Sequence, residues 1–116
     1  MLKRKEEVQK VTKPAPFQGK GEITVRNILD GGDDMYGKGR VFCHTTVSPG
    51  SGIGYHIHEK ESETYYILSG HGTFNDNGTI KEVGPGDVLF TGDGQGHALE
   101  ASQGEPVEMI ALILFR

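Results

Sequence analysis

The sequence predicts an all-β fold in which short antiparallel strands form a sandwich, jelly roll or barrel. Nine apolar or alternating runs recur after residue 21, and each is short enough to be a single strand. The 18 glycines fall singly or in small clusters between these runs, without the three-residue period of collagen. No segment keeps an amphipathic helical period over three turns, so helices are not expected in the core.

The predicted strands are bounded by residues that form tight turns. Pairs such as Pro49-Gly50, Ser69-Gly70 and Pro85-Gly86 separate consecutive runs and favour hairpin connections. The sharpest turn signal is Asn77-Gly78, because these two residues readily adopt the positive φ angles of a type I′ turn. In chain order, strands are expected at residues 23–29, 41–47, 53–58, 63–68, 72–75, 79–83, 88–91, 97–101 and 107–115.

The length of the chain suits one domain, and its first residues differ from the rest. A chain of 116 residues supports a single hydrophobic core. Residues 1–20 mix charges with Pro14 and Pro16 and show no sustained period. We therefore expect an N-terminal arm that is flexible or packed on a partner subunit, followed by a barrel domain at residues 21–116.

Two predicted strands are apolar on both faces. Residues 64–68 and 109–115 place apolar or aromatic side chains at consecutive positions. One face of such a strand packs in the core, and the other face needs a second sheet or another subunit to cover it. The sequence therefore predicts a homodimer.

Composition argues against several classes of partner. Sixteen acidic and twelve basic residues give a formal charge of -4, and no run of Lys and Arg would follow a phosphate backbone, so no nucleic acid partner is expected. The basic start is followed by Glu6 and Glu7, and no later run is long enough to span a bilayer, so we expect a cytoplasmic protein without membrane contact. The single cysteine, Cys43, is expected to be a buried, small apolar residue.

A small group of residues carries the chemistry. His56 and His58 lie two apart in a predicted strand, so both imidazoles point to one face and are placed to bind the same ion. The polar residues 59–62 are expected to form a hairpin connection that returns Glu63 to this pair. His97 opens a later predicted strand and would add a fourth ligand from across the barrel. Taken singly, each residue also fits a solvent-facing polar role.

The spacing of these residues resembles the first sequence motif of the cupin superfamily. Gly50 is followed after five residues by His56, after one more by His58, after four by Glu63 and after six by Gly70. This stretch is similar to the motif at every fixed position. The resemblance implies a double-stranded β-helix, which is a jelly-roll barrel of two antiparallel sheets.

A second stretch resembles the second cupin motif. Gly86 is followed after five residues by Gly92, after one by Gly94 and after two by His97. Gly92 stands where the family has proline, and Ala101 stands where it has asparagine. These positions are not metal ligands in cupins, so the departures bear on the loop at residues 92–96, which is expected to be mobile.

The resemblance implies a metal site. Cupins bind their metal through two histidines and a glutamate of the first motif and the histidine of the second, here His56, His58, Glu63 and His97. Three imidazoles and one carboxylate suit one divalent transition metal per chain, namely Mn, Fe, Ni, Co, Cu or Zn. On an octahedral ion, four protein ligands leave two positions open for a small molecule. A closed structural zinc site is the alternative, although such sites usually recruit cysteine.

Among cupins, the chain is most similar to small single-domain proteins related to oxalate decarboxylases, through residues 65–74 and the turn at 85–87. The resemblance implies a protein that acts on or binds a small oxygenated carboxylate, with manganese among the suitable ions. Arg26 and Arg40 are candidate anchors for that carboxylate, with surface salt bridges as the alternative. Tyr65 falls on the predicted inward face and is a candidate catalytic phenol or a packing aromatic.

Two other functions stay open. A non-catalytic module that senses or sequesters a metal or small ligand fits the small size and the shortage of further polar pocket residues. A metal-dependent dioxygenase or isomerase would use the same ion. No segment suggests a lid with a catalytic glutamate, which weakens the case for decarboxylation in particular.

Overall fold

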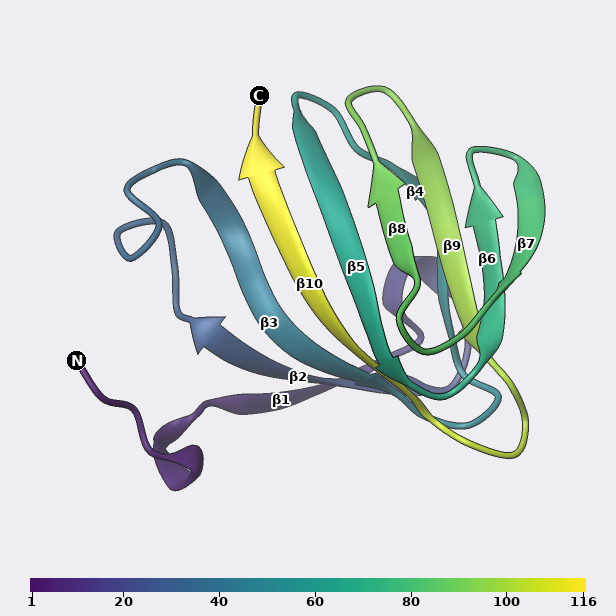
Figure 1. Cartoon of the computed structure of the whole chain (residues 1–116), viewed down its shortest axis with the longest axis horizontal. Helices are drawn as coiled ribbons and strands as arrows, with labels where there is room; N and C mark the ends of the chain where they lie inside the picture. Colours follow the sequence, from purple (N-terminus) through teal and green to yellow (C-terminus); the bar gives the residue numbers. More distant parts are fainter.

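The computed structural model describes residues 1 to 116, which form a barrel of two antiparallel β-sheets (Figure 1). The elements are the short 3-10 helices η1 (Lys5–Glu7) and η2 (Pro16–Gln18) and the strands β1 (Lys10–Pro14), β2 (Glu22–Leu29), β3 (Gly39–Val47), β4 (Gly52–Ile57), β5 (Glu61–Ser69), β6 (Gly72–Asp76), β7 (Thr79–Val83), β8 (Val88–Thr91), β9 (Gly96–Ala101) and β10 (Val107–Phe115). One sheet has the order β1-β2-β3-β10-β5-β8 and the other β4-β9-β6-β7. The predicted fold class is confirmed. No helix has the length and apolar character needed to cross a membrane.

The core lies between the sheets, where inward-facing side chains of both sheets meet. Along β10, Val107, Met109, Ala111 and Ile113 are buried, and the residues between them face outward. Leu99 in β9 closes the core from the four-stranded sheet and is 1% exposed. Burial of this apolar surface is the main favourable contribution to folding.

The nine predicted strands are all present, and their ends differ from the prediction by at most two residues. The predicted tight turn between β6 and β7 is also present. Asn77 has φ 50° and Gly78 has φ 103°, the two positive angles that a type I′ turn requires. Local patterning therefore determined where the strands lie.

β1 is an additional strand within the predicted N-terminal arm. It pairs with β2 in antiparallel register, from Lys10 opposite Arg26 to Pro14 opposite Glu22. Because β1 is an edge strand with exposed residues throughout, its sequence lacks the apolar alternation that marks the other strands. Contact of residues 1–20 with a partner subunit stays a prediction.

The connection between β4 and β5 is not the predicted hairpin. β4 pairs with β9, whereas β5 pairs with β10 and β8. The short turn after Ile57 therefore carries the chain from one sheet to the other. Hairpins and crossovers between sheets both need a polar, exposed turn, so the composition of residues 59–62 does not distinguish them.

Residues 15–20 fold back onto β4. Lys20 and Gly52 exchange two backbone hydrogen bonds, of 3.0 and 2.9 Å. A side chain at Gly54 would place its Cβ 2.0 Å from the carbonyl oxygen of Phe17. Glycine at position 54 thus allows the two backbones to touch.

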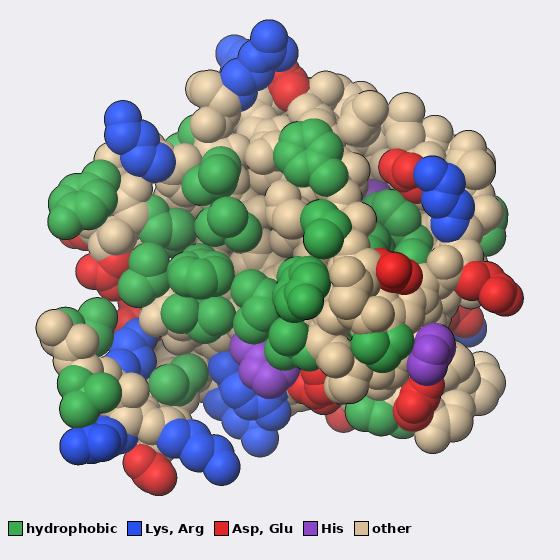
Figure 2. Space-filling model, in the orientation of Figure 1, with side chains coloured by type: hydrophobic (Ala, Val, Ile, Leu, Met, Phe, Trp, Pro, Cys, Tyr) green, Lys and Arg blue, Asp and Glu red, His purple; other side chains and the backbone are tan.

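The outer face of the six-stranded sheet is rich in apolar side chains. Figure 2 shows hydrophobic side chains gathered over β3, β10 and β5. The exposed members on the outer side of β5, β8 and β10 are Tyr66, Leu68, Val88, Phe90 and Leu114. A contiguous apolar surface of this kind is typical of a face that contacts another molecule.

Candidate metal centre

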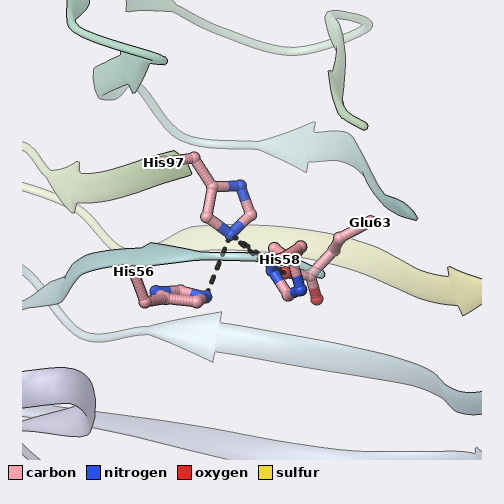
Figure 3. Close-up of side chains that lie close together, drawn as sticks. All are labelled: His56, His58, Glu63 and His97. Carbon is pink, nitrogen blue, oxygen red and sulfur yellow. Dashed lines mark hydrogen bonds and ion pairs between the residues drawn. The ribbon is translucent and has the colours of Figure 1, made fainter. Parts of the chain in front are cut away.

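Four side chains singled out from the sequence converge inside the barrel (Figure 3). One ligating atom from each of His56, His58, Glu63 and His97 lies within 4.8 Å of all the others. The Nε2 atom of His97 is 3.1 Å from that of His56 and 3.2 Å from that of His58. The Oε1 atom of Glu63 is 3.0 Å from His58 Nε2 and 3.1 Å from His97 Nε2. The donor atoms therefore surround a common point.

Two of these histidines come from neighbouring strands of one sheet. His56 in β4 lies directly opposite His97 in β9, so both side chains share a face. The prediction that His97 reaches the site from across the barrel is wrong. Glu63 in β5 does so instead, because the turn after β4 changes sheets while β9 returns beside β4.

A β-bulge in β4 turns His56 toward the interior. The register shifts between Ile53 and His56, so that Gly54 and Tyr55 both stand opposite Ala98 of β9. Ile53 faces the core, and strict alternation would send a residue three positions later outward. The extra residue restores the inward direction at His56. His58 follows the end of β4 and is buried.

Each imidazole has a hydrogen-bond partner at its Nδ1 atom, on the side away from the cluster. The partners are the Gly54 carbonyl for His56 at 2.8 Å, the Glu61 carboxylate for His58 at 2.6 Å and the Thr91 hydroxyl for His97 at 2.8 Å. A carbonyl and a carboxylate only accept, so His56 and His58 donate from Nδ1–H. In the neutral rings the Nε2 atoms then carry the lone pairs, and these are the atoms that face one another.

The charges of the cluster follow from burial and from these contacts. Burial would raise the pKa of the Glu63 carboxyl, but hydrogen bonds from His58 and His97 hold that pKa at about 2. Burial lowers the pKa of His56, whereas the hydrogen bond with Glu63 raises the pKa of His58. The site therefore presents a carboxylate and a neutral His56 imidazole near neutral pH.

This donor set fits a transition-metal ion. The Nε2 atoms of the three rings lie 3.1 and 3.2 Å apart around one point, and a cation there would displace the protons they share and accept their lone pairs. The buried Glu63 carboxylate adds the negative charge that a divalent ion needs. Three nitrogen donors and one oxygen suit a borderline first-row ion, whereas calcium and magnesium prefer more oxygen ligands. The cluster is thus able to hold a divalent metal ion.

The region that contains the cluster matches a known family. A family model described as the Cupin domain matches residues 43–113, which include all four residues of the cluster. The chain belongs to the cupin family. Gly92 and Ala101, the two departures from the second cupin motif, both lie inside the matched region.

Two matches of this cupin come from Thermotoga maritima. An oxalate-binding protein is 41% identical over 96 residues, which cover 83% of this chain and 78% of that protein. The crystal structure of a predicted oxalate decarboxylase superimposes with a TM-score of 0.91 at 36% identity and covers all of both chains. A polyketide cyclase from Streptomyces resistomycificus, at 24% identity and a TM-score of 0.71, covers 99% of this chain and 80% of its own. The cyclase shows the shared fold alone.

Tyr65 lies beside the cluster of this cupin, as its predicted inward position requires. Its hydroxyl is 3.4 Å from His97 Nε2, and the two rings stack with centroids 5.1 Å apart. Burial raises the pKa of the Tyr65 phenol well above its usual value, so the hydroxyl keeps its proton. Tyr65 therefore combines a packing role with a hydrogen-bond donor that faces the site.

The two candidate arginines occupy different places. Arg26 lies opposite His44 on the outward face of the six-stranded sheet and donates to the Thr46 hydroxyl at 2.9 Å, so it does not reach the cluster. Arg40 donates two hydrogen bonds to Glu61, at 3.0 and 2.8 Å. Since Glu61 in turn accepts from a ring of the cluster, Arg40 is linked to the site through that carboxylate.

A cavity of about 200 Å³ opens beside the cluster. Its lining includes His56, His58, Glu63, Tyr65, Arg40, Lys13 and Phe17. The ring of Phe17 stacks on His56, with centroids 3.7 Å apart and planes 10° from parallel. Lys13 and Phe17 were not predicted as site residues, because both lie in the N-terminal arm, whose sequence has no regular period. The sequence shows that Lys13 is basic and that Phe17 is aromatic, but not that either residue lies beside the cluster.

The glycine-rich loop at residues 92–96 contacts the site through its backbone. Gly94 N–H donates to the His58 carbonyl at 2.7 Å, and His58 N–H donates to the Gln95 carbonyl at 3.0 Å. These bonds restrain a loop for which the sequence predicts mobility. The loop therefore helps to position His58.

Proposed function

We propose that the chain binds one divalent transition metal through His56, His58, Glu63 and His97, and a small carboxylate directly at that metal. The observation that supports this most is the convergence of three ring nitrogens and one carboxylate oxygen within 4.8 Å beside a cavity. When bound, the metal supplies positive charge and open coordination positions for a carboxylate oxygen. Mn, Fe, Ni, Co, Cu and Zn all suit these donors.

The chain's own residues shape the space for the ligand. A cavity of about 200 Å³ suits a molecule of few heavy atoms. Phe17 covers the ring of His56, and apolar side chains such as Ile53 and Met109 line the inner wall. The protonated hydroxyl of Tyr65 is available to donate a hydrogen bond to a carboxylate oxygen.

Binding without turnover is the function that the cavity supports best. Glu63 is the only carboxylate in its lining, and as a metal ligand it is not free to transfer protons. The relative that is 41% identical is named an oxalate-binding protein, which supports oxalate or a similar acid as the ligand. Turnover is the second candidate, because the protein that matches over its full length was described as a predicted oxalate decarboxylase.

Calorimetric titration with oxalate tests this proposal. Protein loaded with manganese is expected to bind one oxalate per chain, and protein stripped with a chelator is expected to bind none. Equal binding by the stripped protein would refute coordination at the metal. The loaded protein is then incubated with oxalate. An unchanged oxalate concentration indicates a binding module, formate release a decarboxylase, and oxygen uptake with loss of oxalate an oxygen-dependent enzyme.

Glu61 is expected to strengthen metal binding through His58. Its carboxylate accepts from His58 Nδ1 at 2.6 Å, which orients the ring and makes Nε2 a better donor. Glu61→Ala should weaken metal affinity by about 10- to 100-fold, measured by competition with a metal-sensitive dye. Glu59→Ala is the matched control, since Glu59 is exposed and two residues away. Equal affinities of the two variants would show that Glu61 has no such role.

We also propose that the apolar outer face of β3, β10, β5 and β8 forms a homodimer interface. β5 and β10 lie in the middle of that face and are apolar on both sides, so one chain alone leaves much of their surface in water. A second copy that presents the same face would cover it with two-fold symmetry.

Sedimentation equilibrium measures the molecular mass in solution and therefore tests the homodimer. The wild-type chain is expected at twice its 12.6 kDa. Phe90→Glu, on the proposed interface, should shift the mass to that of one chain. Ile80→Glu is the control, because Ile80 is equally apolar and exposed but lies in β7 of the other sheet. A wild-type mass near 12.6 kDa at micromolar concentration would rule out the dimer.

A further inference from the structure

Two cationic side chains line the cavity beside the cluster, and only one of them has a carboxylate partner. Arg40 is held by two hydrogen bonds to Glu61, at 3.0 and 2.8 Å, so its charge is balanced. Lys13 lines the same cavity and takes part in none of the ion pairs of the chain. The positive charge of Lys13 is therefore available to a ligand.

The strand register points Lys13 toward the cavity. Lys13 in β1 lies directly opposite Ile23 in β2, and residues opposite each other in an antiparallel pair share a face. Ile23 belongs to the buried core and lines the cavity. By the same count, Lys10 lies opposite Arg26 and faces outward. β1 thus carries one lysine on each face.

The pKa of Cys43 agrees with this position of the Lys13 ammonium. Burial raises the pKa of the Cys43 thiol, and the charge of Lys13 opposes that rise. Cys43 is buried in the barrel and lines the same cavity. The ammonium of this exposed residue is therefore close enough to the interior to act on a group that lines the cavity.

The chain after Lys13 fixes this position. Ala15 N–H donates to the Gly21 carbonyl at 2.8 Å, and the two backbone bonds between Lys20 and Gly52 tie the segment to β4. Four residues after Lys13, Phe17 stacks on His56. Four residues span at most about 14 Å, so Lys13 lies within reach of the space in front of the cluster.

We propose that Lys13 is the second anchor of the ligand site, binding one carboxylate of a small dicarboxylate whose other carboxylate lies at the metal. This inference rests on the proposed function and specifies its ligand class. Unlike Arg40, Lys13 is not already neutralised, and unlike Arg26 it faces the cavity. A monocarboxylate would use the metal alone.

With Lys13 included, the charges of the site match a ligand with two negative charges. A divalent ion with the Glu63 carboxylate carries one net positive charge, and Arg40 and Glu61 cancel each other. A dicarboxylate brings two negative charges at neutral pH. One negative charge would then be left over in a partly buried cavity, where an uncompensated charge is costly. Lys13 supplies the missing positive charge.

The test compares Lys13→Gln with Lys10→Gln, its control on the opposite face of the same strand. Each manganese-loaded protein is titrated with oxalate, malonate and acetate in a calorimeter. Lys13→Gln is expected to weaken oxalate or malonate binding about 10- to 100-fold, because a hydrogen bond between charged groups is lost. Acetate binding and bound metal should change less than about twofold. Lys10→Gln should resemble wild type, and Lys13→Arg should restore most of the dicarboxylate affinity.

The outcomes separate this inference from the proposed function. If wild type binds oxalate and Lys13→Gln binds it equally well, the anchor is wrong and the metal-dependent carboxylate site stands. Equal losses of affinity for acetate and for oxalate would also overturn the anchor, because Lys13 would then act only through the overall electrostatic potential of the cavity. Failure of the metal-loaded wild type to bind any of the three acids would overturn both proposals.

Discussion

Replacement of His58 by alanine is expected to abolish stoichiometric metal in the purified protein. His58 Nε2 lies 3.0 Å from Glu63 Oε1 and 3.2 Å from His97 Nε2, within the donor cluster. The substitution removes one of three nitrogen donors and leaves Glu61 and Arg40 without their link to the site. Loss of a supporting residue alone costs about 10- to 100-fold in metal affinity, so loss of a ligand should cost more.

Elemental analysis of the purified variant measures this directly. His71→Ala is the matched control, because His71 is an exposed histidine that pairs only with Glu105, at 2.7 Å. We expect a metal-to-chain ratio near one for wild type and for the control. Metal should also raise the melting temperature of these two proteins and not that of His58→Ala, since a ligand stabilises only the state that binds it. An unchanged metal content in His58→Ala would refute the assignment of the ligands.

The strands and three of the four cluster residues were predictable because they depend on local pattern. Alternation along β10 and the Asn77-Gly78 turn act within a few residues, and the structure shows both as predicted. The spacing of His56, His58 and Glu63 likewise falls within one short stretch of chain. Features that depend only on residues near one another in the chain can therefore be predicted from the sequence.

The relation between β4 and its neighbours could not be predicted in the same way. Whether β4 pairs with β5 or with β9 depends on which sheet each strand joins, and this is decided by packing across the whole barrel. The bulge at Gly54 and Tyr55, which turns His56 inward, depends on that pairing too. The sequence therefore predicted that His97 joins the site, but placed it on the wrong side.

The remaining features of the site lie in the N-terminal arm, where the sequence has no regular pattern. Phe17 has φ 53°, a left-handed conformation that a bulky residue adopts only when its surroundings hold it there. Contacts with β4 hold it, and they exist because Gly54 allows close approach. Lys13 is placed by the register between β1 and β2. Neither placement has a local signature, so residues 1–20 showed only charge and proline.

Leu99→Ala is expected to lower the free energy of unfolding by about 2–5 kcal/mol, the usual cost of removing a large buried aliphatic side chain. Leu99 is 1% exposed and lies opposite Ile53 on one side and Phe74 on the other. It faces the interior two residues after His97, so it forms the layer of core next to the metal ligands. Denaturant unfolding of chelator-treated protein measures the loss without a contribution from metal.

Ile80→Ala is the control for this prediction, because Ile80 is 61% exposed in β7, outside the proposed dimer interface, and should lose less than about 1 kcal/mol. A measurement of metal affinity should distinguish a loss of folding stability from damage to the metal site. His97 is held by its strand register with His56 and by the Thr91 hydroxyl, both of which Leu99→Ala leaves in place. Affinity should therefore fall far less than in His58→Ala. A comparable loss of metal in both variants would instead mean that packing, and not hydrogen bonding, orients the His97 ring.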